Sequence, residues 1–236
     1  MKLNGPIEGI FFAVGWTLLR PASMSWIFID KLTDIVDKNI LSSIPQDRRS
    51  AAYGRAAKYL DANHLVMSMD EELSVYKKFY ALLAEGLPEL GVSQQQIDEI
   101  AYSKVFDMEN YVYYDDAVST LDALRGRYKL GIISDTWPSI ESVLKYGGIE
   151  GYFDTKTYSY YFGKYKPDRR LYLHELDQMG LPPGHTVFID DWEKNLAGAA
   201  ECGIQPVLIT AKPDTVNSGK YPSIGRLSEL LEMLPD

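Results

Sequence analysis

Short apolar runs without helical spacing recur four times along the chain. They cover residues 10–14, 130–133, 186–189 and 206–209, and turn or polar residues follow each one. Apolar runs of this length are typical of strands that are buried on both faces of a sheet. Helical patterns separate the last three runs. Alternation of strands with helices predicts an α/β fold with a parallel sheet and helices on both faces.

The stretch from residue 20 to residue 110 has a different pattern, because helical periodicity dominates and strand-like runs are absent. One amphipathic helix is predicted from apolar residues that recur at three- and four-residue spacing: Phe28, Leu32, Ile35, Val36 and Ile40. The stretch therefore has the character of an inserted helical domain. We divide the chain into a core domain, residues 1–19 and 111–236, and a helical domain, residues 20–110.

Capping-box pairs mark two helix starts within that domain, since each side chain of such a pair bonds a free backbone N–H group. The pairs are Ser68 with Glu71 and Ser93 with Gln96. They predict helices over residues 69–86 and 94–106, and a further helix begins after Pro45. At the far end of the chain, a leucine stripe at residues 227–234 predicts a last helix that docks on the sheet.

Composition narrows the class of protein. A formal charge of −9 and a pI of about 4.9 disfavour a nucleic-acid partner, because affinity for phosphate backbones depends on clustered Lys and Arg. Cys202 is the only cysteine, which excludes an internal disulfide and a cysteine-based zinc site. No signal-like or membrane-spanning stretch is visible. We expect a cytoplasmic protein with a small-molecule partner; neither composition nor periodicity specifies an oligomeric state.

Candidate chemistry lies directly after the apolar runs, since ligands of parallel sheets bind beyond the carboxyl ends of the strands. The residues there are Ala13 to Thr17, Ser134, Asp135 and Thr136, and Asp190 and Asp191, with Lys166 in a preceding loop. Taken singly, each has a structural alternative. Ser134 and Asp135 fit helix caps, Thr17 fits a turn, and Lys166 fits a surface charge.

The pair Asp190-Asp191 is the most specific of these signals. Adjacent carboxylates at the end of a buried strand repel each other unless a cation or hydrogen-bond donors compensate. Oxygen ligands of this kind suit Mg²⁺, which takes one or two carboxylates together with substrate phosphate oxygens. The structural alternative is a pair of helix caps ahead of Glu193 and Asn195.

Four motifs in this order resemble those of haloacid dehalogenase (HAD) superfamily hydrolases. They are Phe11-Phe12-Ala13-Val14-Gly15-Trp16-Thr17, Ile132-Ile133-Ser134-Asp135-Thr136, Lys166-Pro167-Asp168, and Val187-Phe188-Ile189-Asp190-Asp191 with Asn195 and Gly203. The resemblance spans nearly the whole chain. It implies a Rossmann-like core, and it implies that the helical insertion is a C1 cap, the lid that selects substrate.

The resemblance also assigns roles to the strand-end residues. Ala13 stands where the family has its nucleophilic aspartate, and Gly15 stands where many members have an acid-base aspartate. The Thr17 hydroxyl would order the loop. Ser134 would hold a phosphate oxygen, and Lys166 would neutralise the charge of nucleophile and phosphate.

By the same resemblance, Asp190 and Asp191 would bind Mg²⁺ together with the backbone carbonyl of Gly15. Asp135 and Arg20 are further candidates for contact with substrate. The implied activity is Mg²⁺-dependent hydrolysis of a small phosphomonoester through an aspartyl-phosphate. A methyl group cannot attack phosphorus, so we expect Ala13 to inactivate this chain.

Two origins of Ala13 compete. Because the other charged residues of the site are all present, we favour replacement of an original aspartate over a natural pseudoenzyme. Two other functions stay open. One is a metal-independent 2-haloacid dehalogenase, against which Asp190 and Asp191 argue; the other is a non-catalytic protein that binds a phosphorylated ligand or a partner.

Overall fold

The computed structural model describes residues 3–235. Its main sheet has six parallel strands in the order β5-β4-β1-β6-β7-β8. The strands are β1 (Gly9–Phe12), β4 (Lys129–Ser134), β5 (Thr155–Tyr158), β6 (Thr186–Asp190), β7 (Gln205–Ile209) and β8 (Ser223–Ile224). The four strands expected from apolar runs are thus confirmed, as is the α/β class. The two edge strands were not expected, because β5 is largely polar and β8 has only two residues.

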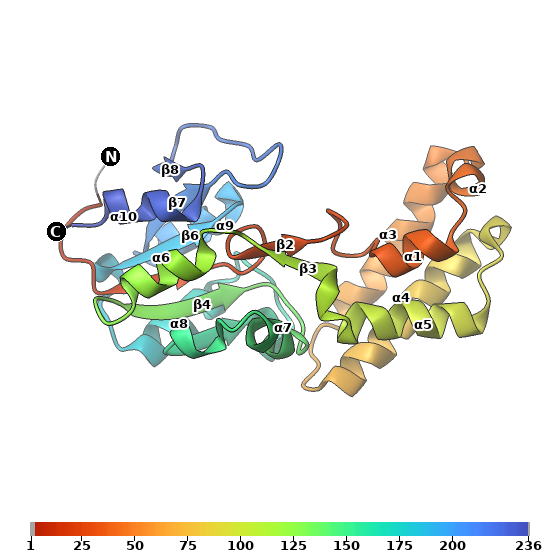
Figure 1. Cartoon of the computed structure of the whole chain (residues 1–236), viewed down its shortest axis with the longest axis horizontal. Coiled ribbons are helices and arrows are strands. Elements are labelled where there is room, and N and C mark those ends of the chain that lie inside the picture. Colours follow the sequence, from red (N-terminus) through yellow and green to blue (C-terminus); the bar gives the residue numbers. More distant parts are fainter. Residues whose placement is uncertain (1–2, 236) are drawn as a thin grey trace. The chain divides into compact units, whose positions relative to one another are not determined.

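Helices cover both faces of this sheet (Figure 1). They are α6 (Ala117–Leu124), α7 (Ile140–Tyr146), α8 (Arg169–Met179), α9 (Glu193–Glu201) and α10 (Leu230–Met233). Leu171 and Leu176 of α8 and Leu196 of α9 pack with Phe11 and Phe188 of the strands in one apolar cluster. Burial of these aliphatic and aromatic side chains from water is the main stabilising contribution to the core.

The C-terminal leucine stripe forms less helix than expected. Residues 227–229 make a 3₁₀ turn, and α10 adds a single helical turn. Leu227 and Leu230 are fully buried, whereas Leu231 is 36% exposed. The stripe therefore docks as predicted, but on a short element.

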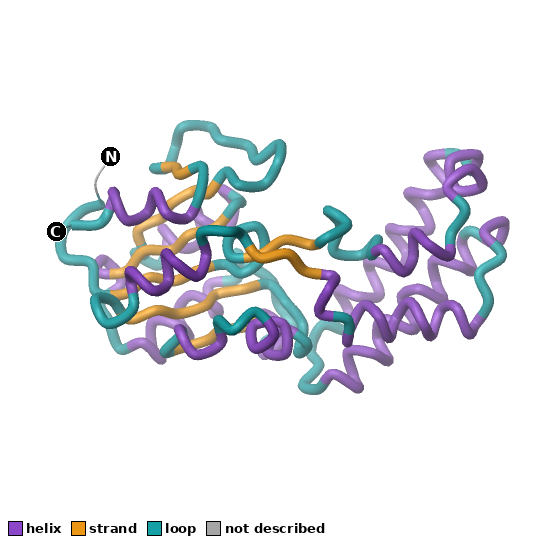
Figure 2. The backbone as a smooth tube through the Cα atoms, viewed as in Figure 1, coloured by secondary structure: helices purple, strands orange, loops and turns teal. Residues whose placement is uncertain are grey.

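Between residues 21 and 112 the chain is mostly helical (Figure 2). The helices are α1 (Asp30–Ile35), α2 (Lys38–Ser43), α3 (Gln46–Ala62), α4 (Met69–Gly86) and α5 (Gln94–Phe106). The predicted helices at 69–86 and 94–106 are confirmed with those bounds. Phe79 and Ile100, both 1% exposed or less, lie at the centre of the apolar cluster that joins these helices.

Short 3₁₀ turns complete the secondary structure. They are η1 (Pro88–Leu90), η2 (Met108–Asn110), η3 (Glu150–Tyr152), η4 (Ser159–Tyr161), η5 (Pro183–His185) and η6 (Leu227–Glu229).

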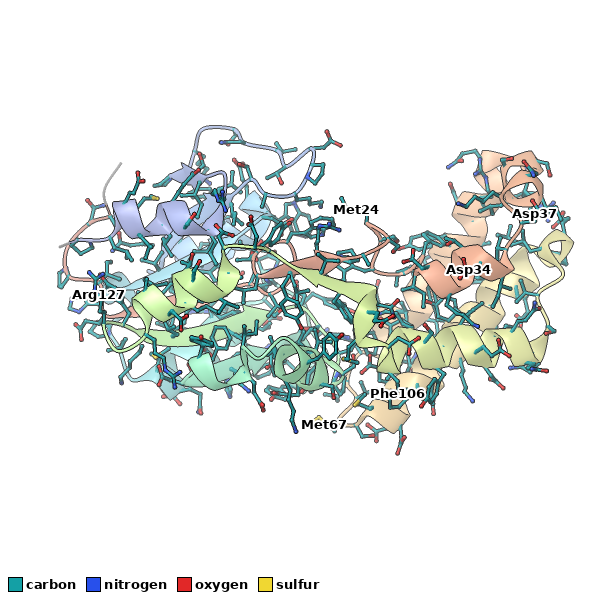
Figure 3. The ribbon with its side chains drawn as sticks, in the orientation of Figure 1. Met24, Asp34, Asp37, Met67, Phe106 and Arg127 are labelled. Atoms are coloured by element: carbon teal, nitrogen blue, oxygen red, sulfur yellow. The ribbon has the colours of Figure 1, made fainter. Side chains whose placement is uncertain are left out.

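The single amphipathic helix expected across residues 28–40 is wrong, because the chain forms two short helices there. Asp37 lies at the break (Figure 3), and its carboxylate accepts hydrogen bonds from the backbone N–H groups of Asn39 and Ile40. An aspartate in this position starts a new helix and ends the periodicity of the preceding one. As a result, Phe28 and Ile40 are about 40% exposed instead of sharing one buried face.

The two capping boxes also differ. Ser93 and Gln96 make both reciprocal hydrogen bonds, as predicted. Ser68 accepts from the N–H of Glu71, but the Glu71 carboxylate accepts from the N–H of Met67 instead of that of Ser68. The second half of that box is therefore absent.

Contacts divide the chain into two compact units. The first, here called the core unit, comprises Met1–Arg20, Tyr113–Thr136 and Leu144–Asp236; the second, the helical unit, comprises Pro21–Val112 and Trp137–Val143. The sequence division differs mainly in omitting residues 137–143 from the helical part. A two-stranded sheet of β2 (Leu19–Pro21) and β3 (Tyr111–Tyr113) contains the two chain crossings at residues 20–21 and 112–113.

The segment 137–143 joins the helical unit through specific contacts. The buried Glu72 carboxylate accepts from the backbone N–H and the hydroxyl of Ser139. His64, 1% exposed, packs edge-on against the Trp137 ring at 4.6 Å. From its isolated position in the sequence, we expect a surface or helix-cap role for His64; the surface role is wrong, because the histidine is buried in an aromatic cluster. Within residues 3–235, no helix is long and apolar enough to cross a membrane.

Candidate active site

Three neighbouring strands of the core unit bring the candidate residues to one edge of the sheet. Phe12, the last residue of β1, pairs with Ile132 of β4 and with Ile189 of β6. Because all three strands are parallel, the next level of the ladder holds Ala13 beside Ile133 and Asp190. The N–H of Ala13 donates to the carbonyl of Ile189 at 2.9 Å, which continues the ladder by one residue.

Lys166 reaches the same level from the loop before α8. Its Nζ donates to Asp190 Oδ2 at 2.6 Å and to the carbonyl oxygen of Ile133 at 3.2 Å. The lysine is 6% exposed and Asp190 is fully buried. The ammonium group is therefore held by the two residues that flank Ala13, and the prediction that Lys166 lies at the strand ends agrees with this geometry.

Electrostatics favour the charged form of this lysine. Burial by itself lowers the pKa of Lys166, but the carboxylates of Asp190 and Asp135 outweigh burial and hold the pKa above its ordinary value. Breaking a buried pair of this kind by removing one partner leaves an uncompensated charge, whose cost is about 3–5 kcal/mol. The ion pair thus fixes a permanent positive charge at the strand ends.

The loop that holds Lys166 is packed tightly against α9. Lys166 is followed by a cis peptide bond to Pro167. A side chain at Gly198 of α9 would place its Cβ 2.6 Å from Pro167 Cβ, so glycine permits this close approach.

Asp190 uses all of its acceptor capacity within the core unit. Oδ1 accepts from the N–H of Trp192 at 2.8 Å and from Asn195 Nδ2 at 3.0 Å. Oδ2 accepts from Lys166 and, at 3.1 Å, from the same amide of Asn195. A carboxylate has about four lone-pair positions, and all four are occupied here.

Asp191 differs from its neighbour because, within residues 3–235, the partners of its carboxylate are its own backbone N–H and one lysine. Lys212 Nζ lies 3.7 Å from Asp191 Oδ2. Burial, followed by the charge of Asp190, raises the pKa of Asp191 to about 6. Of the two carboxylates, Asp191 is the one with oxygens free to bind a cation.

The turn after β1 has an unusual backbone. The carbonyl of Val14 accepts from the N–H groups of Thr17, Leu18 and Leu19, and the N–H of Trp16 donates back to the carbonyl of Leu19 at 2.7 Å. Trp16 has a φ of 59°, a left-handed conformation that is rare for a bulky residue. Strain of this kind, of order 1–3 kcal/mol, is concentrated at functional sites.

Thr17 is fully buried in this turn. In the part of the chain that the structure describes, its hydroxyl has no hydrogen-bond partner. Buried hydroxyls are nearly always satisfied, so one without a partner indicates a place where another polar group belongs.

The end of β4 presents Ser134 and Asp135. Ser134 is 3% exposed, and the Asp135 carboxylate accepts from the backbone N–H of Lys166 at 2.8 Å. The following residue, Thr136, is fixed by two hydrogen bonds with the hydroxyl of Ser159. Asp135 thus positions the Lys166 loop, and its contact with substrate stays a prediction.

Arg20 acts on Tyr114, whose pKa the charge of Asp191 also affects. Arg20 lies in β2, and its charge opposes the rise that burial causes in the pKa of Tyr114. From their spacing in the sequence, Tyr158 and Tyr160 fit a strand slightly better than a lining of the substrate cleft. Their rings form a stack 5.5 Å apart, and both are at most 5% exposed. Tyr158 ends β5, but Tyr160 lies in η4 and not in a strand.

The oxygen atoms at the strand ends are the groups that could bind Mg²⁺. Among residues 3–235, no group of three or more His, Cys, Asp and Glu side chains gathers as a metal site would need. The oxygens that remain are those of Asp191 and of backbone carbonyls such as that of Gly15. They are hard ligands suited to Mg²⁺, which keeps several waters and binds substrate phosphate. The residues present therefore fit Mg²⁺ through the carboxylate of Asp191 and the Gly15 carbonyl. The Thr17 hydroxyl, which has no partner within residues 3–235, lies two residues after Gly15.

Three contributors had no role assigned to them from the sequence, although Trp16 and Asn195 lie within the motifs. Asn195 holds both oxygens of Asp190, Trp16 shapes the β1 turn, and Lys212 Nζ lies 5.7 Å from the centre of the Trp16 ring as well as beside Asp191. A signal for Lys212 existed, because it follows the end of the fourth apolar run, where strand-end chemistry is expected. No comparable signal in the sequence indicated that Asn195 donates to the carboxylate of Asp190.

Comparison with protein families matches residues 29–203 to haloacid dehalogenase-like hydrolases. Among curated proteins, the chain is similar to the pyrimidine 5′-nucleotidase YjjG of Escherichia coli, with 30% identity over 123 residues, 50% of this chain and 55% of that protein. It is 29% identical over 127 residues to the GMP/IMP nucleotidase YrfG of the same organism, covering 52% of this chain and 57% of that protein.

A (S)-2-haloacid dehalogenase 4A of Burkholderia cepacia is 26% identical over 124 residues, covering 52% of this chain and 54% of that protein. The chain spans about half the length of the curated relatives it matches. Among solved structures, a HAD phosphatase from Thermococcus onnurineus has a TM-score of 0.64 at 22% identity over 96% of this chain and 97% of that one. A 2-haloacid dehalogenase from Pseudomonas syringae has a TM-score of 0.67 at 19% identity, with the same two coverages. These two likenesses show the fold.

Proposed function

The chain belongs to the haloacid dehalogenase-like hydrolases, and we propose that its site is built for Mg²⁺-assisted hydrolysis of a small phosphomonoester, with turnover lost here because Ala13 holds the nucleophile position. The observation that carries the proposal is the placement of Lys166. The buried ammonium group is held by the two neighbours of Ala13 in the strand ladder. A fixed cation there stabilises charge on the nucleophile and on the phosphoryl oxygens in the transition state.

An aspartate at position 13 would complete the reaction path. Its carboxylate would attack phosphorus and form an aspartyl-phosphate, while the P–O ester bond breaks and the alcohol leaves. Water would then cleave the aspartyl-phosphate and release phosphate. Ser134 would hold a phosphoryl oxygen. Gly15 offers no carboxyl group, so the leaving oxygen would take its proton from water.

The metal would be held by Asp191 and the backbone carbonyl of Gly15, and it would neutralise charge on the phosphoryl oxygens. Asp190 is engaged by Lys166 and Asn195 in this chain. An aspartate at position 13 would compete for Lys166 and release an oxygen of Asp190, so the second predicted carboxylate would become available only in the restored site.

Nucleoside 5′-monophosphates are the first substrates to test, since two of the relatives are named nucleotidases. The helical unit would act as the cap that selects among them. Arg20, in the ribbon between the two units along the chain, stays a candidate for contact with substrate.

The decisive experiment compares Ala13→Asp with Ala13→Asn, which has the same shape but no nucleophilic carboxylate. Phosphate release from p-nitrophenyl phosphate and a nucleoside monophosphate panel is measured with Mg²⁺ and with EDTA. We expect turnover in Mg²⁺ for Ala13→Asp alone, roughly 10⁴-fold or more above the other forms, since loss of a nucleophile costs on that order. Failure of Ala13→Asp to release phosphate from any of the panel would sink the proposal.

The same variants test the two competing functions. Two observations support the competing dehalogenase function, which is metal-independent attack on carbon. One relative is named a (S)-2-haloacid dehalogenase, and all acceptor positions of Asp190 are occupied within the protein. Release of halide from 2-chloropropionate by Ala13→Asp in EDTA would identify that chemistry. A non-catalytic binding protein would instead show tight binding of a phosphorylated ligand, with no turnover after the substitution.

A further inference from the structure

The helical unit contains a cavity that shares no residue with the candidate active site. Its volume is about 380 Å³, which lies within the range of sites that bind small molecules. Helices α1 to α5 and the turn η1 all contribute to its wall. The lining is mostly apolar, with Leu32, Leu41, Tyr80, Leu83 and Ile100 among its side chains.

The cavity is partly open. Tyr80 and Ile100 are at most 2% exposed, whereas Phe28 and Tyr53 are 42% and 41% exposed. The rings of Phe28 and Tyr53 lie 6.1 Å apart, tilted at 36° to each other. An apolar ligand entering between the helices would bury surface that now faces water, and burial of apolar area is favourable by about 25 cal/mol per Å².

One charged side chain, Arg49 of α3, lines this apolar wall. The side chain is partly exposed, but its Nε atom is buried and has no hydrogen-bond partner within residues 3–235. Its neighbour Arg48 is paired with Glu89 through both guanidinium nitrogens and is exposed. A buried guanidinium N–H without an acceptor is costly, so its presence beside a cavity points to an acceptor that arrives with a ligand.

We propose that this cavity binds a medium-chain aliphatic carboxylate, with the hydrocarbon chain among the leucines and the carboxylate on Arg49. The charge decides between possible head groups. A single guanidinium matches a monoanion and can hold a carboxylate through two parallel hydrogen bonds. A phosphate dianion would require a second cation, and Arg48 is already engaged with Glu89.

The test measures binding of decanoate to the whole chain by calorimetry. The comparison ligands are 1-decanol and acetate. Decanoate is expected to bind, acetate is expected not to bind, and decanol is expected to bind at least about tenfold more weakly, since a charge-assisted hydrogen bond contributes about 1.5–3 kcal/mol. The variant Arg49→Gln should weaken decanoate binding at least about tenfold. The matched variant Arg48→Gln should bind decanoate like the parent chain.

Filling the cavity gives a second, independent variant. Ala84 lines the wall and is partly exposed, so Ala84→Phe adds volume there while circular dichroism verifies the fold; it should abolish binding of decanoate and decanol together. No binding of decanoate at millimolar concentration, or equal binding by Arg49→Gln and the parent, would overturn the assignment. Sedimentation would overturn it as well, if the ligand-free chain forms a dimer that Ala84→Phe disrupts, because the occupant would then be a second copy. None of these outcomes depends on phosphatase activity.

Discussion

The two units bury polar groups differently. In the core unit, buried charged side chains are ion-paired with residues distant in sequence: Lys166 with the buried Asp190, and the buried Asp116 with the exposed Arg226. In the helical unit, aromatic and aliphatic faces of helices make most of the interior, hydrogen bonds at helix ends are local, and the buried Glu72 carboxylate is held by the N–H and hydroxyl of Ser139. The difference follows from architecture. Parallel strands gather residues distant in sequence at one edge, whereas antiparallel helices bury a face that each sequence segment already carries.

The largest expected effect comes from breaking the core pair. Lys166→Met leaves the Asp190 carboxylate buried without a cation, which should cost about 3–5 kcal/mol of stability in urea unfolding. The double variant Lys166→Met/Asp190→Asn should regain most of that loss, because no unpaired charge then remains. Lys164→Met, at an exposed neighbour, is the control. Equal stability of parent and Lys166→Met would show that the core unit does not depend on this pair.

A comparable loss in the helical unit should come from packing alone. Phe79 is fully buried, with ring centres 6.2 Å from Tyr76 and 5.1 Å from Tyr80. Phe79→Ala should cost about 3–5 kcal/mol through lost burial and the cavity left behind, without dependence on salt or pH. Tyr102→Ala, at a position 57% exposed, should cost much less. Hydrogen exchange followed by mass spectrometry would locate the effect, and a loss spread evenly over both units would contradict the contrast.

One pH-dependent contribution to stability should come from Glu175 in the core unit, whereas the buried His64 of the helical unit, whose pKa burial lowers to about 4, acts in the opposite sense. Glu175 is fully buried and accepts from the hydroxyls of Thr155 and Thr157. Burial raises the pKa of Glu175 to about 7 from 4.5. The folded state therefore binds more protons at Glu175 between about pH 4.5 and pH 7, so the contribution of Glu175 to stability falls as pH rises through that window, by up to about 3 kcal/mol.

Glu175→Gln should remove that fall, because the side chain can no longer ionise. Glu201→Gln at an exposed site is the matched control. Unfolding free energies measured from pH 4.5 to pH 8 provide the comparison. An unchanged pH profile in Glu175→Gln would mean that another group causes the dependence.

The smallest effect is a local one in the helical unit. Ser93 caps α5 and shares a reciprocal box with Gln96. Ser93→Ala should cost about 1 kcal/mol, with increased hydrogen exchange limited to the first turn of the helix. Ser119→Ala, whose hydroxyl bonds only a backbone carbonyl of its own turn, should have a smaller effect. Increased exchange throughout α5 after Ser93→Ala would show that the cap does more than close one helix end.

Local signals carried much of the fold. Apolar runs identified the four central strands, and capping residues placed α4 and α5 with their observed bounds. The helical pattern failed at residues 28–40, where the Asp37 cap outweighed apolar spacing. The apolar runs did not predict β5, because this edge strand is largely polar and contains no such run.

The sequence by itself determined which residues stand at strand ends, and thereby Ala13, Ser134, Asp190 and Asp191, whereas Lys166, in a loop, was added by the motif resemblance. That much follows from short-range patterns. Only the tertiary structure decided which of these residues form ion pairs and hydrogen bonds with one another. In the folded chain, Lys166 and Asn195 donate hydrogen bonds to Asp190, whereas Asp191 forms an ion pair with Lys212. Pairing and burial depend on how separate segments meet in space, and the free energy of a charge is set by those neighbours and not by its place in the chain.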